Sequence, residues 1–386
     1  MSDIASKKNI IYMIDGLGMG GAERLMIPIL GHIDHQRFNV RVCVLQSKHG
    51  NPLADDIRTL NAPVDFVEVK HLRDIQSLWR LRNYLKHTHA DLLHTQLEFS
   101  NILGNISAKL LRLPSVCTVH VLPPSNPDFK TRLHQRTEWL ALRLFCNRVI
   151  TVSEETRRQY ILHSGIPNRK LLTIYNGIDL TNFQRLEPDP QRVALRNEFR
   201  LPDDSNLLIT VAVLRQLKGI EYMLRALPDI LRAHPNTYYL IVGDGPHREA
   251  LSLTAQQAGV QEHVIFAGTR NDIPHLLSAS DIFILPTLTE ALPTVLAEAM
   301  ACRLPIVASA VGGVPEMVVD GVNGILVQPA NPAELSQVCN NLLAHPDKLS
   351  ALGESGWSFV NQKFNINQQV TQLQDLYLEQ IERHGN

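Results

Sequence analysis

The stretch NIIYMIDGLGMGGAERLMIPILGHI (residues 9–33) opens with an apolar run, passes through four glycines and ends in a segment of helical period. The run at 9–14 favours a buried strand, because it is short and rich in isoleucine and tyrosine. Beyond the glycines, apolar residues recur at helical spacing: Leu25, Met26, Ile29, Leu30 and Ile33. A strand, a glycine-rich turn and a helix in this order predict the start of an α/β unit.

The same alternation continues along the chain and then restarts. Uniformly apolar runs separated by helical segments are typical of parallel strands covered on both faces. The first half gives predicted strands at 9–14, 39–45, 64–69, 91–95, 115–120 and 148–152, and the second half at 206–213, 237–243, 263–268, 281–286, 305–309 and 324–329. The sequence therefore predicts an α/β chain with two parallel-sheet units.

A polar, proline-bearing segment at 176–206 separates the two units, and we place the boundary near residue 184. The predicted domains are residues 1–184, residues 185–364, and a C-terminal amphipathic helix at 365–386. That helix either packs on the second domain alone or crosses back to the first.

Composition excludes several classes of protein. The 386 residues are 44% hydrophobic and carry 37 basic and 38 acidic side chains, so a dedicated nucleic-acid binder, which needs a basic excess, is not expected. Five widely spaced cysteines without a CxxC pair favour buried, reduced thiols. The N-terminus lacks the apolar core of a signal peptide, and no span of about 20 apolar residues occurs. A cytoplasmic protein is expected, free or at the inner face of the plasma membrane.

No metal site is expected. The sixteen histidines show no metal-ligand spacing, and the closest cluster, His87, His89 and His94, reads as a helix end followed by a strand end.

Ligands of open α/β sheets bind beyond the carboxyl ends of the strands, so the loops there matter most. In the first loop, Gly20 and Gly21 precede a helix and would let the backbone approach a phosphate or a sugar. The spacing GxGxGG is not a dinucleotide fingerprint, and a tight turn without a ligand explains it as well.

The first loop of the second unit carries Arg215 and Lys218 ahead of Gly219 and a helix. Two cations at a strand's carboxyl end suit a diphosphate, since each charge-assisted contact contributes roughly 1.5–3 kcal/mol. The alternative is a solvated basic turn.

Two further loops of this unit are less specific. Gly243 lies in a strand–helix turn in which Asp244 could cap the helix. Arg270 lies in the next loop, whose backbone could cradle a base, and Asp272 could cap the following helix.

The segment TEALPTVLAEAMA (289–301) places Glu290 and Glu298 in an otherwise apolar run. Pro293 suits the first position of a helix, so Glu290 would lie in the loop and Glu298 about two turns further on. The backbone N–H groups of Leu292 and Thr294, on either side of Pro293, would favour an anion. The two carboxylates would accept hydrogen bonds from hydroxyl groups. The alternative is a capping glutamate followed by a surface glutamate.

In the first unit, His120 ends a predicted strand and is either a structural histidine or a contact to a sugar hydroxyl. Two basic segments, 74–89 and 132–149, carry Trp79, Trp139 and Phe145. Such helices can lie on anionic lipid, or their aromatic side chains can pack on the sheet.

The segment EALPTVLAEAMACRLPIVASAVGGVPEMVVDGVNGILVQP (290–329) resembles the signature of glycosyltransferase family 4. GGAER, VSEETR, YNGID, VGDGP and FAGTRNDIP resemble further family segments in family order, and together they cover nearly the whole chain. The resemblance implies the GT-B fold of two facing Rossmann-like domains, and a retaining enzyme that needs no metal.

By this resemblance, Arg215 and Lys218 would bind the diphosphate of a UDP- or GDP-sugar, Glu298 the ribose, and Glu290 the transferred sugar. His120 would contact that sugar, Gly20 and Gly21 would approach donor phosphate or acceptor, and the C-terminal helix would cross back to the first domain. The acceptor would be a glycan or lipid-linked hydroxyl, as in envelope polysaccharide or lipopolysaccharide synthesis, and peripheral membrane contact would suit it.

Three positions depart from the family pattern, which often has glycine where Leu214, Ala291 and Arg303 stand. Arg303 would cost roughly 1 kcal/mol if its φ is positive. Rival functions for the same residues are a GT-B-fold nucleotide-sugar epimerase, a glycosidase using the two glutamates, and a non-catalytic nucleotide-sugar binder.

Overall fold

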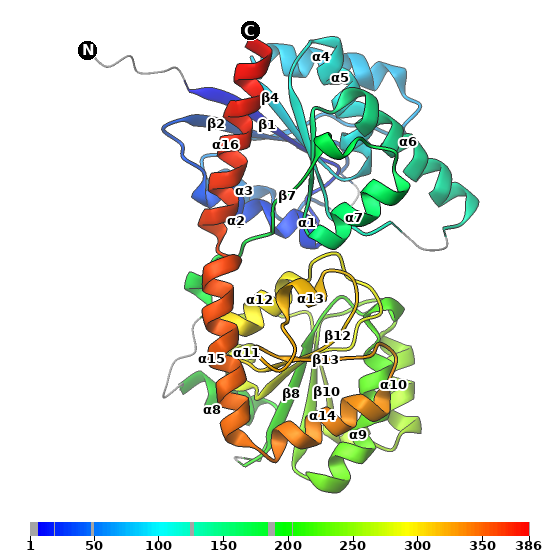
Figure 1. The fold of residues 1–386 in the computed structure, drawn as a ribbon, viewed down its shortest axis with the longest axis vertical. Coiled ribbons are helices and arrows are strands. Elements are labelled where there is room, and N and C mark those ends of the chain that lie inside the picture. Colours follow the sequence, from blue (N-terminus) through cyan, green and yellow to red (C-terminus); the bar gives the residue numbers. More distant parts are fainter. Residues whose placement is uncertain are drawn as a thin grey trace. The chain divides into compact units, whose positions relative to one another are not determined.

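The computed structural model describes residues 7–18, 20–47, 50–123, 127–183, 190–202 and 204–385 (Figure 1). The chain divides into two compact units. The first comprises Met1–Gly177 with Ile366–Asn386, and the second Ile178–Asn365. Residue 184, at the predicted boundary, lies outside the described residues.

The first unit is built on a seven-stranded sheet of order β3-β2-β1-β4-β5-β6-β7, in which every neighbouring pair is parallel. The strands are β1 (Lys8–Ile14), β2 (Phe38–Val44), β3 (Val64–Phe66), β4 (Leu92–Gln96), β5 (Ser115–Val119), β6 (Arg148–Thr151) and β7 (Leu171–Thr173). All but β7 are expected from apolar runs. β7 is not expected from the sequence, although β3 at the opposite edge of the sheet is equally short.

Helices cover both faces of this sheet. Ile10, Tyr12 and Ile14 of β1 join the core under α2 (Met26–His32), α3 (Ala54–Thr59) and α16 (Ile366–Gly385), while Ile11 and Met13 join the core under the opposite helix layer. That layer contains α4 (Ile75–His87), the π-helical turn η1 (Ser100–Gly104), α5 (Asn105–Leu110) and α6 (Phe129–Phe145). The unit also contains α1 (Gly21–Arg24), α7 (Glu154–His163) and the short turn η2 (Asn168–Lys170).

The helix expected after the first glycine-rich turn is broken into α1 and α2 at Leu25. Pro28 explains the break, because it has no N–H to donate to the carbonyl of Arg24.

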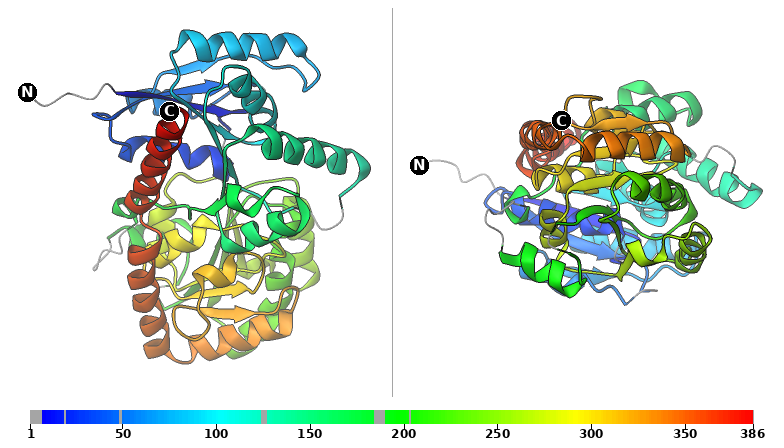
Figure 2. Two further views of the ribbon diagram at one scale, coloured as in Figure 1. Left: turned by 45° about the horizontal axis from the view of Figure 1, so that its top comes forward. Right: turned by 90° about the horizontal axis from the view of Figure 1, so that it is seen from below.

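The C-terminal helix α16 belongs to the first unit and lies along α2 (Figures 1 and 2). Its apolar face buries Val370, Leu373, Leu376 and Tyr377. The Tyr377 hydroxyl bonds to the Tyr12 hydroxyl and lies 2.7 Å from Nδ1 of His94, whose Nε2 lies 2.8 Å from Oγ1 of Thr118. A buried polar chain therefore fixes α16 to the sheet.

The second unit holds a six-stranded parallel sheet of order β10-β9-β8-β11-β12-β13. The strands are β8 (Asn206–Val211), β9 (Thr237–Val242), β10 (Val264–Gly268), β11 (Ile282–Leu285), β12 (Ile306–Ser309) and β13 (Ile325–Val327). All six are expected from the sequence. The parallel-sheet α/β class is thus confirmed for both units.

The helices of the second unit are α8 (Pro190–Glu198), α9 (Ile220–Ala233), α10 (Arg248–Gln257), α11 (Ile273–Ala279), α12 (Thr294–Ala301), α13 (Val314–Met317), α14 (Pro332–Leu343) and α15 (Pro346–Lys363), with short turns η3 (Leu180–Asn182), η4 (Gln216–Lys218) and η5 (Gln261–His263). Apolar side chains of α9 and α14 pack on one face of the sheet around Tyr239 and Ile241.

Other sequence expectations meet the structure directly. All five cysteines are buried and unpaired. Arg303 has φ +56°, so the predicted backbone cost applies; its side chain pairs with Glu354 at 2.9 Å and lies over the Trp357 ring. Leu214 is fully buried in the core. No helix in the described part of the chain combines the length and apolar character needed to cross a membrane.

Candidate functional site

The strongest candidate site lies in the second unit, where the loops after the neighbouring strands β8 and β11 join. The N–H of Leu288 donates to the carbonyl of Leu217 at 2.9 Å, and the hydroxyl of Thr287 donates to the same carbonyl at 3.1 Å. These bonds bring two predicted site segments, 215–219 and 287–294, together at the carboxyl edge of one sheet.

Gly219 makes this close approach possible. Its φ is +61°, and a methyl group on its α-carbon would lie 2.1 Å from the carbonyl oxygen of Pro286. Only glycine fits both the left-handed backbone and the contact. The glycine therefore positions Lys218, which precedes it, against the β11 loop.

Lys218 and Glu290 form the central contact of the site. Nζ of Lys218 lies 2.5 Å from Oε1 of Glu290, and the two side chains are only 28% and 13% exposed. The backbone of Glu290 is held in turn, because the N–H of Gly313 donates to its carbonyl at 3.1 Å. Two residues predicted separately from sequence are thus direct partners.

Arg215 lies three residues before Lys218, at the start of η4, and is exposed. No described residue makes a hydrogen bond or an ion pair with its guanidinium. Because Lys218 is already paired with a carboxylate, Arg215 is the cation of this loop that has no such partner. The loop can therefore attract an anion.

Glu298 lies within α12, half-buried on a helix whose Leu296, Ala297, Ala299 and Met300 are buried. Leu292 and Pro293, ahead of the helix, are buried, and Thr294 is half-buried. Pro293 occupies the N-cap rather than the expected first helical position. The carboxylate is therefore not that of an ordinary solvated surface glutamate.

The remaining predicted residues of this unit have structural partners. A methyl group at Gly243, with φ +122°, would lie 2.0 Å from the Ala212 carbonyl oxygen, so this glycine allows two strand-end loops to touch. The Arg270 guanidinium contacts Glu198 at 2.6 Å and Asp272 at 2.7 Å. Its side chain is therefore engaged within the protein. That the backbone of this loop contacts the base of a nucleotide stays a prediction.

Two predicted helix caps are wrong. Asp244 accepts from the N–H of Gly245 at 2.7 Å, and α10 begins later, with His247 at its N-cap. Asp272 occupies the N-cap of α11 but makes no side-chain cap, because its carboxylate pairs with Arg270. The guanidinium keeps the pKa of Asp272 below its usual value, since this hydrogen bond favours the carboxylate.

The other predicted residues belong to the first unit. Gly20 is the N-cap of α1 and Gly21 its first residue, and α1 is a single turn. Ahead of this turn, Asp15 follows β1 and accepts from the N–H groups of Phe99 and Ser100 at 2.9 and 2.7 Å. Burial raises the pKa of Asp15 to about 6 against the effect of these bonds.

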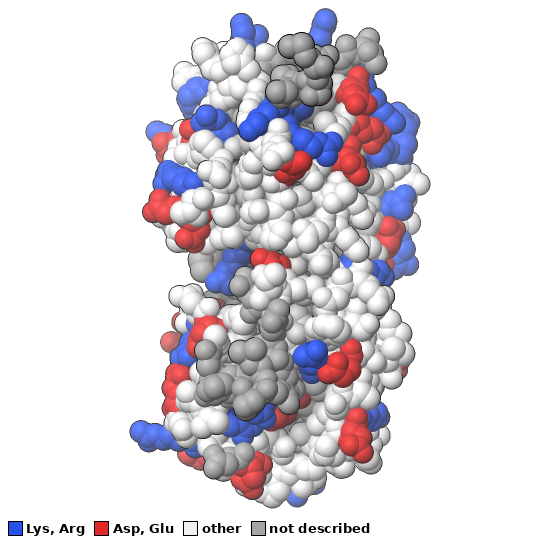
Figure 3. Space-filling view, turned by 90° about the vertical axis from the view of Figure 1, so that its left-hand side faces the viewer, with Lys and Arg blue, Asp and Glu red and all other residues white. Residues whose placement is uncertain are grey.

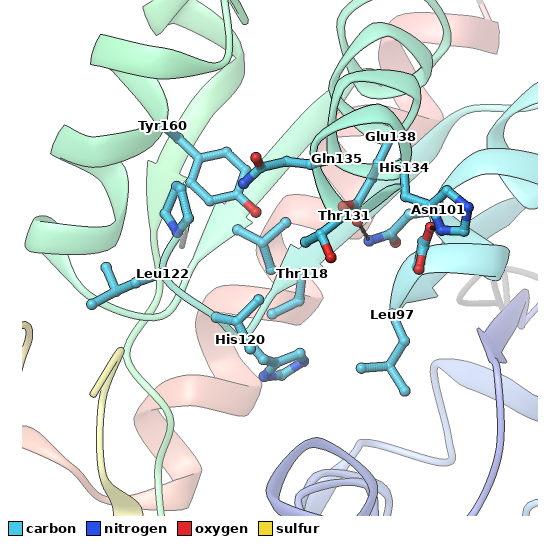
Figure 4. A pocket seen from close by; sticks show the side chains of 14 residues that line it. Leu97, Asn101, Thr118, His120, Leu122, Thr131, His134, Gln135, Glu138 and Tyr160 are labelled. Carbon is cyan, nitrogen blue, oxygen red and sulfur yellow. Dashed lines mark hydrogen bonds and ion pairs between the residues drawn. The ribbon is translucent and has the colours of Figure 1, made fainter. Parts of the chain in front are cut away.

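A pocket of about 330 Å³ opens at the carboxyl edge of the first sheet (Figure 4). Figure 4 shows His120 and Thr118 from the end of β5 facing Thr131, His134, Gln135 and Glu138, which project from α6. Nε2 of His120 lies 3.1 Å from the Gln96 side-chain oxygen. His120 therefore has a structural partner and also lines the pocket.

Apolar side chains, among them Leu97, Val121 and Leu122, line the pocket together with carboxyl, amide, hydroxyl and imidazole groups. None of the described residues that line it is Lys or Arg. Glu138 accepts from Nδ2 of Asn101 at 2.7 Å, and burial raises the pKa of Glu138 to about 7. Burial lowers the pKa of His120 to about 4. Glu98 pairs with His134 at 2.9 Å.

Sequence reasoning missed this cluster. Glu138 is a single acidic residue in a basic amphipathic segment, where it reads as an ordinary polar position. The sequence feature that could have pointed to it is the presence of one acidic residue in a segment rich in arginine. Within the described ranges, His, Cys, Asp and Glu side chains do not gather in threes where a metal ion would fit.

Two family models match the chain one after the other. Glycosyltransferase Family 4 matches residues 19–182, and Glycosyl transferases group 1 matches residues 191–358. The two matches fall one in each half of the chain and together span most of it.

Curated relatives agree with these models. An uncharacterised glycosyltransferase of Methanocaldococcus jannaschii is 30% identical over 66% of this chain and 66% of its own length. A UDP-Gal:alpha-D-GlcNAc-diphosphoundecaprenol alpha-1,3-galactosyltransferase of Escherichia coli is 25% identical over 94% of this chain and 95% of its own length.

A solved structure of Anabaena HepE in complex with UDP superposes with a TM-score of 0.85, at 22% identity, over 96% of this chain and 100% of the other. At this identity the likeness shows the fold. Taken with the two consecutive family models, it identifies the chain as a family 4 glycosyltransferase with the GT-B class of fold.

Proposed function

We propose that the chain is a retaining hexosyltransferase that moves a sugar from a nucleotide diphosphosugar to a hydroxyl of a glycan or lipid-linked acceptor. One observation carries the proposal. At one sheet edge of the second unit, the exposed Arg215 stands beside a partly buried Lys218–Glu290 pair. Such a site offers cations to a diphosphate and a carboxylate to a sugar.

The donor would be held by groups of the second unit. Arg215 and Lys218 would bind the diphosphate through charge-assisted hydrogen bonds. The N-terminal end of α12, beyond Leu292 and Pro293, would add its partial positive charge at Thr294. Glu298 would accept hydrogen bonds from the two hydroxyls of a ribose.

The ion pair of Lys218 with Glu290 gives donor binding a second consequence. A diphosphate competes with Glu290 for the three N–H donors of Lys218. As Lys218 turns to the phosphates, the Glu290 carboxylate becomes available to accept hydroxyls of the transferred sugar. Donor binding and sugar positioning would thus be coupled through one lysine.

In the transfer step, the bond between the anomeric carbon and the phosphate oxygen breaks, and a bond to the acceptor oxygen forms on the same face. The acceptor proton moves to the departing phosphate oxygen. Arg215, Lys218 and the helix end would stabilise the charge that develops on the leaving diphosphate, which is the kind of electrostatic contribution that dominates many enzymes. The anomeric configuration would be retained, and no step requires a metal ion.

Names of similar proteins support a UDP- or GDP-sugar as donor. The Escherichia coli relative is named for UDP-galactose, a Mycolicibacterium smegmatis relative that is 33% identical over 55% of this chain is named GDP-mannose-dependent, and Anabaena HepE has also been solved with UDP-glucose. These names differ in nucleotide and sugar, and what they share is a nucleotide diphosphosugar donor.

The first unit would serve the acceptor. His120 would contact the transferred sugar, Gly20 and Gly21 would approach donor phosphate or acceptor, and the pocket beside His120 would take part of the acceptor. An envelope polysaccharide or lipopolysaccharide intermediate at the cytoplasmic face of the membrane would suit peripheral membrane contact. Nucleic acid is not proposed as a partner.

The test is acceptor-dependent release of nucleotide. Purified protein is incubated with UDP- and GDP-sugars, with and without a panel of lipid-linked and glycan acceptors, and nucleotide and product are quantified with the anomeric configuration read by NMR. We expect nucleotide release only when an acceptor is present. A donor whose anomeric bond is axial should give a product whose anomeric bond is axial. Interconversion of nucleotide sugars without acceptor would identify an epimerase, and binding without turnover of any donor would identify a non-catalytic binder.

A further inference from the structure

Helix α6 has two different faces. Its inward face supplies Thr131, His134, Gln135 and Glu138 to the pocket of the first unit. Its other face is open and carries an apolar stripe with sequence spacings of four, seven and four residues: Phe129 is 83% exposed, Leu133 49%, Leu140 54% and Leu144 52%. These spacings align the four side chains along one side of the helix.

The charges on the open face have one sign. Lys130, Arg132, Arg136 and Arg143 are exposed beside the stripe, and Glu138, the only acidic residue of α6, faces the pocket. On the side of the molecule drawn in Figure 3, by contrast, acidic and basic side chains are intermixed. α6 is therefore a local cationic, apolar surface on a chain of formal net charge −1.

We infer that the open face of α6 docks on a surface of anionic phospholipid. A helix with exposed leucines and phenylalanine, flanked by Lys and Arg, lies in the membrane interface with its apolar side among the acyl chains and its cations at the headgroups. Each cation near an anionic surface contributes to binding by attraction to it. The helix stands at the periphery of its unit, where a flat partner can reach it (Figures 1 and 2).

Charge distinguishes this occupant from a second copy of the chain. In a two-fold dimer the same patch meets itself, so four cations of one α6 would face four of the other. No acidic side chain on the open face offsets this repulsion. An anionic lipid surface, in contrast, complements every charge on it.

The neighbouring helix layer supports the same reading. α4, which packs with α5 and α6 on one face of the sheet, exposes Ile75 and Trp79 to 71% and 57%, and the guanidinium of Arg82 lies 5.7 Å from the Trp79 ring centre. Trp139 and Phe145 of α6 instead pack inward, Trp139 against Tyr160. Of the three aromatic residues that the sequence suggested as membrane anchors, Trp79 is exposed, whereas Trp139 and Phe145 are not.

Docking through α6 would also restrict the acceptor. One face of the helix lines the pocket and the other would lie on lipid, so a docked protein holds that pocket within a helix width of the headgroups. This step rests on the proposed function, because it assumes that the pocket receives the acceptor. The acceptor would then be one that remains anchored in the membrane.

The test is co-sedimentation of the full chain with vesicles. Phosphatidylcholine vesicles are compared with vesicles that also contain phosphatidylglycerol, at low and at high salt. Two double variants remove either cations (Arg132→Gln/Arg136→Gln) or apolar anchors (Leu133→Gln/Leu140→Gln). The matched control, Arg225→Gln/Leu253→Gln, makes the same kinds of change at exposed positions of the second unit.

We expect binding to anionic vesicles only, weakened by salt. Removing two cations should lower the partition coefficient roughly thirtyfold; removing two leucines should lower it tenfold or more, and the control should bind like the wild type. Equal binding of all variants, or no binding of the wild type at low salt, would overturn the inference, as would a stable dimer that the α6 variants dissociate. Nucleotide-induced thermal stabilisation, measured on the same proteins, reports separately on the proposed function.

Discussion

The carboxyl edges of the two sheets have the same architecture and opposite electrostatics. The edge of the second unit presents Arg215 and Lys218 on a glycine-pinned loop, with Glu290 as a close partner. The edge of the first unit presents a pocket without Lys or Arg among its described lining, where burial perturbs Glu138 and His120. Parallel sheets offer both edges as binding positions, so the loop side chains decide which chemistry each can perform.

This difference separates two tasks. Cations on loops stabilise negative charge and suit a diphosphate. Neutral hydrogen-bonding groups beside carboxyls offer no cation to a phosphate and suit hydroxyls. This division of tasks is wrong if the cations of the second unit can be removed without loss of diphosphate binding. It is also wrong if the pocket groups of the first unit can be removed without loss of acceptor binding.

The largest expected effect comes from removing the cations of the second edge. Arg215→Ala/Lys218→Ala should lower the rate of nucleotide release roughly 10³-fold or more, because each lost electrostatic contact to a developing charge typically costs 10²- to 10³-fold. The measurement is steady-state release with the best donor and acceptor. Arg225→Ala, an exposed arginine on α9, is the control. Full activity of the double variant would contradict the proposal that this loop binds the donor diphosphate.

Next in size is the glycine that shapes this edge. Gly219→Ala should lower the free energy of unfolding by about 3 kcal/mol, because its methyl group would collide with the Pro286 carbonyl oxygen and its φ is positive. Gly259→Ala shares the positive φ, at +69°, but its methyl group would meet nothing within 4 Å. It should cost only about 1 kcal/mol. Denaturant unfolding measures both, and equal costs would show that the loop contact does not matter.

In the first unit, Tyr377→Phe should cost about 2 kcal/mol of unfolding free energy. The change leaves the Tyr12 hydroxyl and Nδ1 of His94 without their buried partner. Tyr222→Phe, at a half-buried site without such a chain, should cost less than about 0.5 kcal/mol. If Tyr377→Phe is as mild, α16 is held by its apolar face alone.

The last expected effect is a dependence of stability on pH. Burial raises the pKa of Glu138 from 4.5 to about 7, so its contribution to stability is full below about pH 4.5 and is lost as pH rises through 7. The stability of the wild type relative to Glu138→Gln should therefore fall by roughly 3 kcal/mol between pH 4.5 and 7.5. Unfolding of both proteins across this range measures it. A constant difference would mean that Glu138 is ionised in the pocket.

His94 and His120 act in the opposite direction and cancel in that comparison. Burial, followed by the charge of His120, lowers the pKa of His94 to about 3. Since unfolded histidines bind protons below about pH 6.5, both histidines make the folded protein less stable as pH falls from there.

Much of this could be predicted from the sequence because it depends on local pattern. Twelve runs of apolar residues mark twelve of the strands, and their strand-end loops carry the predicted cations and glutamates. β7 is not predicted, although β3 and β13 are equally short, and Pro28 breaks a helix whose apolar spacing is otherwise regular.

What could not be predicted depends on contacts between distant residues. The partnership of Lys218 with Glu290 joins positions 72 residues apart. Burial raises the pKa of Glu138 against the effect of its hydrogen bond from Asn101, 37 residues away in the chain. The open stripe of α6 can be recognised only once the other face of the helix is known to line a pocket. Periodicity identifies an apolar face but does not say what covers it.

The most direct test of the account is calorimetric titration of UDP and GDP, without metal, into the wild type, Arg215→Ala/Lys218→Ala and Glu138→Gln. The account predicts that one nucleotide binds the wild type, that the cation variant loses this binding by tenfold or more, and that Glu138→Gln keeps it. Unchanged affinity in the cation variant, or lost affinity in Glu138→Gln alone, would contradict the assignment of the diphosphate to the second unit.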